Sequence, residues 1–118
     1  MFLNDWKESG IDGMREDFGL KESDLDGVEV LLASYTYEDY YGSAFVLFRK
    51  DGRLFEVNGS HCSCYGLSER SYCVDGQTQW QPEETTVEAL LHRLEHDTYQ
   101  FDGMRDELHQ VLGDLMKK

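Results

Sequence analysis

The sequence predicts an α+β fold in which helices cover an antiparallel sheet of three or four strands. Three strand-like runs follow one another at residues 28–37, 43–50 and 53–58, and two helix-like runs occupy the C-terminal third. The composition is that of a folded chain, with 118 residues, 40% hydrophobic content, 13% aromatic content and one proline. A chain of this length buries roughly two-thirds of its unfolded surface on folding, so one domain spanning residues 1–118 is expected.

The N-terminal third is expected to form one or two short helices. Phe2, Leu3 and Trp6 lie at near-helical spacing, and Met14 and Phe18 repeat that spacing at positions i and i+4. Glycines interrupt the pattern, so a single long helix is not predicted. Acidic residues crowd the same segment, which suits either a packing helix with a solvated face or a contact surface.

The middle of the chain predicts an antiparallel meander. Residues 28–37 are β-branched and aromatic enough for a strand. In residues 43–50 the apolar side chains fall on both faces, which predicts a central strand covered on both sides. Asp51 and Gly52 supply the two left-handed positions of a type I′ hairpin turn, and residues 53–58 form the returning strand.

A fourth strand and two helices are expected after the meander. The strand is predicted at residues 77–81, is centred on Trp80 and ends at Pro82. The helices are expected on one face of the sheet, with the N-terminal helical segment nearby.

The two C-terminal helices are predicted from caps and from periodicity. Thr85 and Glu88 stand three residues apart, the spacing of a capping box at a helix start, and Asp102 is the expected cap of the last helix. Apolar residues fall on one face of each helix: Val87, Leu90, Leu91 and Leu94 in the first, and Met104, Leu108, Val111, Leu112 and Leu115 in the second.

The charge balance restricts the kinds of partner. Twenty-four acidic residues stand against eleven basic ones, which gives a net charge of −13. Binding to nucleic-acid phosphates needs clustered Lys and Arg, and an anionic membrane surface is disfavoured for the same reason. The charge therefore serves solubility, or it attracts a basic partner such as a nucleic-acid-binding protein. No apolar run approaches the roughly 18 residues of a membrane span, and no signal peptide is recognised, so a cytoplasmic location is expected.

The stretch Gly-Ser-His-Cys-Ser-Cys-Tyr-Gly-Leu at residues 59–67 is the richest in groups that bind metals or act as nucleophiles. A zinc site would use His61, Cys62, Cys64 and Cys73, with His92 or His96 in reserve, because zinc takes four thiolate or imidazole ligands. The spacing argues against it, since Cys62 and Cys64 are separated by one residue instead of the two to four of a zinc knuckle. The alternative is a compact turn after the third strand, with thiols that pack under the helix of residues 85–94.

A cysteine enzyme is the least favoured interpretation. It needs a thiolate with a base at hydrogen-bond distance, and His61 beside Cys62 diverges from it on an extended chain. The sequence also lacks a phosphate-binding Gly-rich loop, a G-x-S-x-G elbow and an H-E-x-x-H motif. We therefore expect a protein that is not an enzyme and that has no cofactor.

A protein-contact surface is predicted at two places. The turn between the first two strands carries Tyr37, Glu38, Asp39, Tyr40 and Tyr41, and tyrosine supplies contact area at low entropic cost. The alternative for these tyrosines is ordinary packing at the edge of the sheet. The acidic N-terminal segment adds the second group, Glu16 and Asp17.

Several motifs resemble a family of small proteins from tailed-phage genomes. They are the runs Ala-Ser-Tyr-Thr-Tyr at residues 33–37 and Gly-Ser-His-Cys-Ser-Cys-Tyr-Gly-Leu at residues 59–67, then Trp80, Pro-Glu-Glu-Thr-Thr at residues 82–86 and Ala89-Leu90. The resemblance covers about residues 33–94, and residues 68–77, which include Cys73, are an insertion relative to the family pattern. It implies a phage origin and a host cytoplasm, and it brings no catalytic residues.

Together these observations predict a small acidic protein that inhibits a host protein. The expected target is a nucleic-acid-handling or defence protein, as for an anti-CRISPR or anti-restriction protein, and the expected device is nucleic-acid mimicry. The argument from charge to this function is an association. The alternative is a small zinc-binding or accessory module centred on residues 61–73.

Overall fold

A computed structural model of the chain describes residues 1–4, 6–38, 41–61, 80, 82–96, 101 and 104–117. Within these residues the fold is α+β, as predicted, but the sheet has five strands instead of three or four. The strands, in sheet order, are β1 (Phe2–Asn4), β2 (Glu29–Glu38), β3 (Tyr41–Lys50), β4 (Arg53–His61) and β5 (Glu83–Thr85). The helices are α1 (Gly10–Phe18), the 3-10 helix η1 (Glu22–Leu25), α2 (Val87–His96) and α3 (Arg105–Met116).

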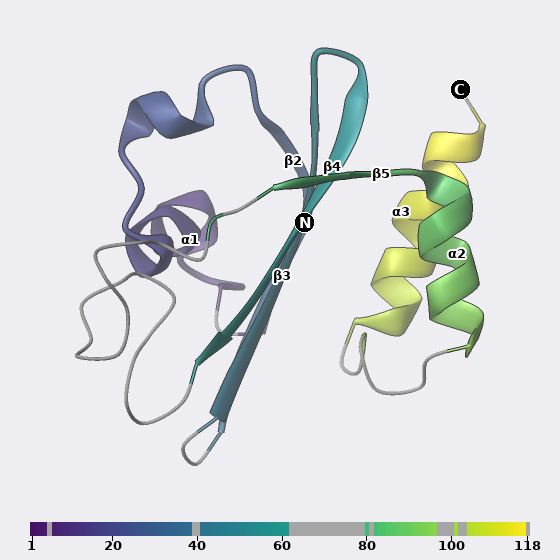
Figure 1. The fold of residues 1–118 in the computed structure, drawn as a ribbon. Helices are drawn as coiled ribbons and strands as arrows, with labels where there is room; N and C mark the ends of the chain where they lie inside the picture. The colour runs from purple at the N-terminus through teal and green to yellow at the C-terminus, as the bar shows by residue number, and fades with distance from the viewer. Residues whose placement is uncertain are drawn as a thin grey trace.

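The sheet lies between two helical layers. Helix α1 and η1 cover one face, and α2 and α3 cover the other (Figure 1). The C-terminal helices therefore share one face as predicted, while the N-terminal helix covers the opposite one. None of the described helices has the length and apolar character needed to cross a membrane.

Strand β1 replaces the predicted helical start of the chain. Phe2, Leu3 and Asn4 run parallel to β2, with Phe2 opposite Ala33, whereas the other neighbouring strands are antiparallel. Phe2 packs against the core on the α1 side and Leu3 against the core on the α2 side. The helical interpretation of Phe2 and Leu3 is wrong because three residues are too few to separate a period of two from a period of 3.6.

The β3–β4 hairpin has the predicted turn. Asp51 has φ of 54° and Gly52 has φ of 77°, which are the two left-handed positions of a type I′ turn. The returning strand is longer than predicted, because it continues through residues 59–61 and pairs Gly59 with Ala44. The compact turn predicted from residue 59 is therefore wrong for residues 59–61, and residues 62–67 lie outside the described part of the chain.

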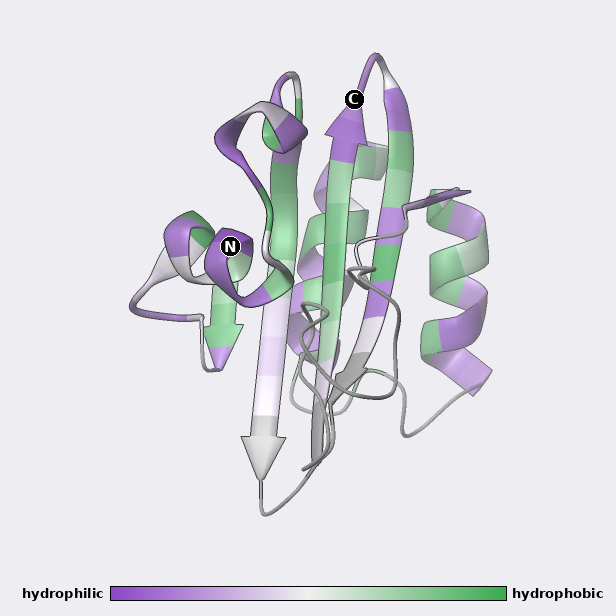
Figure 2. Ribbon diagram, turned by 60° about the vertical axis from the view of Figure 1, so that its left-hand side comes forward, coloured by the Kyte–Doolittle hydropathy of each residue, from purple (hydrophilic) through white to green (hydrophobic). Residues whose placement is uncertain are grey.

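Strand β3 is central and is buried on both faces, as its pattern predicts. Hydrophobic residues follow the strands between the two helical layers (Figure 2). The buried core on the α1 side consists of Trp6, Met14, Phe18, Ala33, Tyr35, Ala44, Val46, Phe48 and Val57. The buried core on the α2 side consists of Leu32, Phe45, Leu47, Leu90, Leu94, Phe101, Met104, Leu108 and Leu112.

Neither predicted helix cap is found where it was expected, and the fourth strand predicted at residues 77–81 lies outside the described residues except for Trp80. Trp80 is not part of a strand, and β5 begins only after Pro82. Thr85 is the last residue of β5, and the cap of α2 is Thr86, whose hydroxyl accepts a hydrogen bond from the Ala89 amide at 3.1 Å. Helix α3 begins later than predicted, with Met104 at its N-cap and no side-chain cap bond; Asp102 lies outside the described residues.

Candidate functional site

The two groups of predicted contact residues lie in different parts of the molecule. Glu16 and Asp17 belong to α1, which lies on one face of the sheet, whereas Glu38 ends β2 and Tyr41 begins β3 at one end of the sheet (Figure 1). The backbone of Tyr37, Glu38 and Tyr41 continues the β2–β3 ladder, with Glu38 opposite Tyr41. Asp39 and Tyr40 lie outside the described residues, as do the side chains of their three neighbours, so the aromatic contact patch stays a prediction.

Asp17 has a structural contact that its neighbour Glu16 lacks. The indole Nε1 of Trp6 donates a hydrogen bond of 2.7 Å to a carboxylate oxygen of Asp17. Only 1% of Trp6 is exposed, and its ring centroid lies 5.8 Å from that of Phe18 and 5.2 Å from that of Tyr35. A buried N–H without an acceptor is costly, so Asp17 stabilises the packing of Trp6 beneath α1.

The outer side of α1, η1 and their flanking residues is acidic, and we call it the N-terminal acidic surface. Residues 6–28 contain seven carboxylates and three basic side chains. Arg15 approaches Asp12 at 3.5 Å, and Asp24 accepts a hydrogen bond from the Lys21 amide. The exposed members of the surface are Glu8, Asp12, Glu16, Glu22, Asp24 and Asp26.

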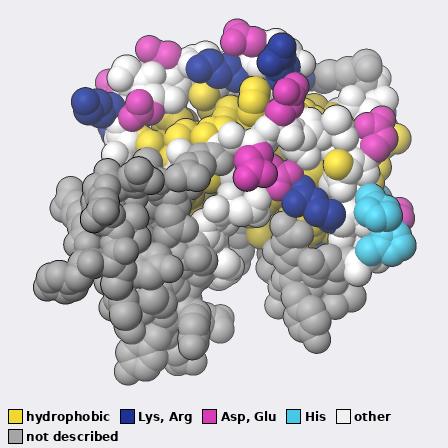
Figure 3. Space-filling model, viewed as in Figure 1, with side chains coloured by type: hydrophobic (Ala, Val, Ile, Leu, Met, Phe, Trp, Pro, Cys, Tyr) yellow, Lys and Arg dark blue, Asp and Glu magenta, His cyan; other side chains and the backbone are white. Residues whose placement is uncertain are grey.

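Four of these carboxylates are not neutralised. Within the part of the chain that the structure describes, Glu8, Glu16, Glu22 and Asp26 form no ion pair. Their charges therefore face solvent and contribute to an outward negative potential. Figure 3 shows acidic side chains scattered over the described part of one face, with Lys and Arg side chains among them.

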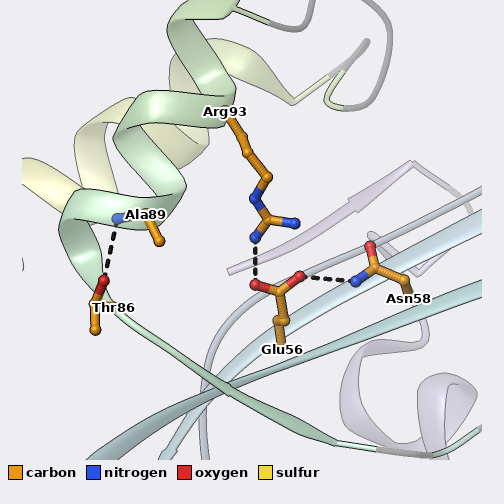
Figure 4. A network of polar contacts seen from close by, with 5 residues as sticks. All are labelled: Glu56, Asn58, Thr86, Ala89 and Arg93. Carbon is orange, nitrogen blue, oxygen red and sulfur yellow. Dashed lines mark hydrogen bonds and ion pairs between the residues drawn. The ribbon is translucent and has the colours of Figure 1, made fainter.

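The most constrained charge lies on the opposite face of the sheet. Glu56 of β4 is only 5% exposed and forms an ion pair with Arg93 of α2 (Figure 4). The Asn58 amide donates a hydrogen bond of 2.9 Å to the other carboxylate oxygen of Glu56, and the guanidinium of Arg93 lies 5.8 Å from the ring centre of Phe101. This ion pair holds α2 against the sheet.

The environment of Glu56 keeps its carboxylate ionised. Burial raises the pKa of Glu56, but hydrogen bonds from Arg93, Asn58 and Thr85 and the positive charge of Arg93 together outweigh it, and the pKa lies below its ordinary value. A general acid or base is most effective when its pKa is near the working pH. Glu56 is therefore a structural carboxylate and a poor candidate for proton transfer.

A small apolar pocket opens on the α1 side of the sheet. The ring of Phe48 stacks with those of Phe55 and Trp80, at centroid distances of 5.4 and 5.5 Å. The pocket has a volume of about 220 Å³, and Lys50 and Asp24 also line it. Pockets for drug-sized ligands usually measure about 300–1,000 Å³, so this one is too small for such a ligand and is best explained as part of the aromatic core.

The predicted sulfur ligands fall outside the described residues. This holds for Cys62, Cys64 and Cys73, while His61 is described only as the last backbone position of β4. Among the residues that the structure does describe, there is no group of three or more His, Cys, Asp and Glu side chains placed to hold a metal ion. The zinc alternative at residues 61–73 stays a prediction.

Comparison with known proteins adds no family to this geometry. No protein-family model matches the chain, and neither a curated protein nor a solved structure matches it. The resemblance to a tailed-phage family therefore stays a prediction.

Two structural contacts were missed from the sequence. Glu56 and Arg93 are 37 residues apart, and the only available signal was a charged residue at an inward position of a strand. Trp6 and Asp17 are eleven residues apart, and no local motif links an indole to an acceptor across a turn. The closeness of His92 and His96, in contrast, could be read from the sequence, because the two residues stand at helical spacing on α2.

Proposed function

We propose that this chain is a non-enzymatic, acidic binding protein of phage origin that inhibits a host nucleic-acid-handling or defence protein. The proposed target is a protein of the CRISPR or restriction type, with a basic surface that normally holds nucleic acid. The observation that carries the proposal is a set of exposed carboxylates on the N-terminal acidic surface that form no ion pair with any described residue: Glu8, Glu16, Glu22 and Asp26.

Electrostatics favour this kind of partner. A net charge of −13 on 118 residues repels nucleic acid and attracts basic surfaces. Nucleic acid gains affinity for a basic groove from release of the cations condensed on its own phosphates, whereas a protein that presents carboxylates gains from the complementary potential of the groove. Complementary charge also raises the association rate.

The support beneath the acidic surface favours recognition by a preformed shape. Met14 and Phe18 of α1 are fully buried against the sheet, and the Trp6–Asp17 hydrogen bond fixes the chain before the helix. Glu16 lies on this packed helix and keeps its position, so less conformational entropy is lost there on binding than with a disordered acidic tail.

The test compares two faces at equal net charge. One variant carries Glu8→Gln, Glu16→Gln, Glu22→Gln and Asp26→Asn on the N-terminal acidic surface. The matched control carries four substitutions of exposed carboxylates on α2 and α3: Glu88→Gln, Glu95→Gln, Asp106→Asn and Asp114→Asn. Both variants lose four negative charges, so only the location of the change differs.

Inhibition of DNA cleavage and binding are measured against a panel of CRISPR effector complexes and restriction nucleases at several salt concentrations. We expect the N-terminal variant to lose at least about tenfold in affinity for the inhibited target, because each of several charge contacts contributes a fraction of the binding free energy. The control should stay within about threefold. Equal losses in both variants, or wild-type protein that binds no member of the panel, would contradict the proposal.

A further inference from the structure

Two histidines lie side by side on the outer face of α2. His92 and His96 are one helical turn apart, and their ring centroids are 4.3 Å from each other with an interplanar angle of 46°. Both side chains are exposed, and histidine side chains gather at one place on the face shown in Figure 3. Neither the packing of α2 nor the proposed inhibitory surface uses these rings.

The separation of the rings suits a shared metal ion. An imidazole nitrogen binds zinc at about 2.0–2.1 Å, which places the ring centre roughly 3.2 Å from the metal. Two rings bound at angles of about 90–109° are then roughly 4.5–5.2 Å apart between their centres. The observed 4.3 Å falls a few tenths of an ångström short of this range, so a small side-chain rotation brings the two rings into chelating positions.

The surrounding charge favours a cation. His96 is the last residue of α2, where the helix dipole is negative. The exposed carboxylate of Glu95 is next to His96, and Glu88 lies one turn before His92. The nearest basic side chain on the helix, Arg93, is engaged by Glu56 at the sheet, so its charge is largely compensated.

We propose that His92 and His96 form a two-imidazole site for one divalent first-row transition-metal ion, such as Zn²⁺. Imidazole is a preferred ligand of these ions, and histidines at i and i+4 on one helix face are a known chelating pair. Among the described residues no third side chain completes the set, so the two imidazoles are the protein ligands that we propose. The site is proposed without the predicted sulfur ligands, which lie outside the described residues, and it does not depend on the proposed inhibitory function.

The experiment is a titration of the full chain with Zn²⁺, followed by calorimetry and by the NMR signals of the histidine rings. The test variants are His92→Ala and His96→Ala, which replace exposed residues by the best helix former, and circular dichroism checks that each is folded. The matched control is His109→Ala, because His109 is an exposed histidine on the neighbouring helix α3 and has no histidine within its own helix.

We expect one equivalent of Zn²⁺ that shifts the ring signals of His92 and His96 together. Either alanine variant should weaken this equivalent at least about tenfold, since a chelate becomes a single ligand, while His109→Ala should stay within about twofold. A hundredfold excess over Kd should raise Tm of the wild type by at least about 4 °C, and less in the two test variants.

Zinc held by sulfur is separated from this site by a variant with Cys62→Ser, Cys64→Ser and Cys73→Ser. The histidine equivalent should persist in that variant. If the variant does not fold, the ring signals of the wild-type protein still report the site directly. Zinc binding that leaves the ring signals of His92 and His96 unshifted, or that is unchanged in both alanine variants, would overturn the proposal, as would an absence of binding.

Discussion

The two faces of strand β3 hold their helical layers by different chemistry. On the α1 face the core is rich in aromatic rings, and Trp6 contacts both Phe18 and Tyr35. On the α2 face the core is mostly leucine, and the Glu56–Arg93 ion pair joins the sheet to the helix. On the α2 face a buried ion pair thus joins the helix to the sheet, whereas most charged side chains of the α1 layer are exposed to solvent.

This difference has a functional meaning. A buried ion pair whose hydrogen bonds are satisfied sets the position of a helix but offers nothing to a partner. Exposed carboxylates add little to stability and remain free for association. Stability and binding are therefore expected to depend on different faces, and substitutions on each face separate the two contributions.

The largest effect is expected from Trp6→Ala. The substitution removes a side chain that is only 1% exposed, leaves a cavity beneath α1 and strips Asp17 of its donor. Replacing a buried aromatic residue by alanine costs about 3–5 kcal/mol of the free energy of unfolding. Urea unfolding measures the loss. Trp6→Phe is the control. It keeps an aromatic ring in the core, so its loss of unfolding free energy should be less than half of that of Trp6→Ala.

The corresponding substitution on the α2 face is Glu56→Gln, which removes the ion pair with Arg93. It leaves the guanidinium of Arg93 without its ionic partner, and Arg93 has 33% of its side chain exposed, so water offsets part of the cost. We expect a loss of about 2 kcal/mol at neutral pH, below the 3–5 kcal/mol of a fully buried pair. A double-mutant cycle with Arg93→Met should show a coupling energy of at least about 1 kcal/mol; additive effects would show that the ion pair does not clamp α2.

The pH dependence of the same variant gives an independent check. The pKa of Glu56 is lower in the folded protein than its ordinary value, so its contribution is present above the unfolded-state pKa, about 4.3, and is lost as the pH falls through the folded-state pKa. The difference in stability between wild type and Glu56→Gln should therefore be constant from about pH 6 to 7 and shrink towards about pH 3. A difference that grew on acidification would mean that the pKa is raised.

Local patterns predicted much of the fold. The alternation of Phe45 and Leu47 with Val46 and Phe48 predicted that β3 is covered on both faces, and the two core clusters confirm it. The Asp-Gly pair predicted the hairpin turn because positive φ at two successive residues has few other solutions. The apolar stripes of α2 and α3 were visible for the same reason, since their period is a property of the helix itself.

The remaining elements depend on pairings between distant residues. Phe2 pairs with Ala33 in a parallel ladder, and the three residues of β1 carry no local pattern that predicts this partner. The Glu56–Arg93 ion pair joins residues 37 positions apart, and its geometry depends on how α2 packs on the sheet. At the start of α2, two adjacent threonines compete, and pairing of Thr85 with Leu54 in the sheet leaves Thr86 to cap the helix.

Two neighbours on α1 test how far the acidic surface contributes to stability. Asp17→Ala leaves the buried Trp6 N–H without its acceptor, so we expect a loss of about 1–2 kcal/mol. Glu16→Ala is the matched control, because Glu16 is exposed and forms no ion pair within the described residues; its effect should stay within about 0.5 kcal/mol. Chemical unfolding of both variants measures the contrast, and equal losses would contradict the structural role of Asp17.

The smallest effect is expected from substitutions at the N-caps of α1 and α2, which lie on opposite faces of the sheet. The hydroxyl of Thr86 accepts the Ala89 amide at the start of α2, whereas Ser9 at the start of α1 makes no side-chain cap bond. Thr86→Ala should therefore cost about 1 kcal/mol, and Thr86→Ser, which keeps the hydroxyl, should restore most of it. Ser9→Ala should change stability by only a few tenths of a kcal/mol, because no backbone N–H loses a partner. Thermal unfolding of the three variants measures the order, and a larger loss at Ser9 than at Thr86 would show that the Ser9 side chain does cap α1.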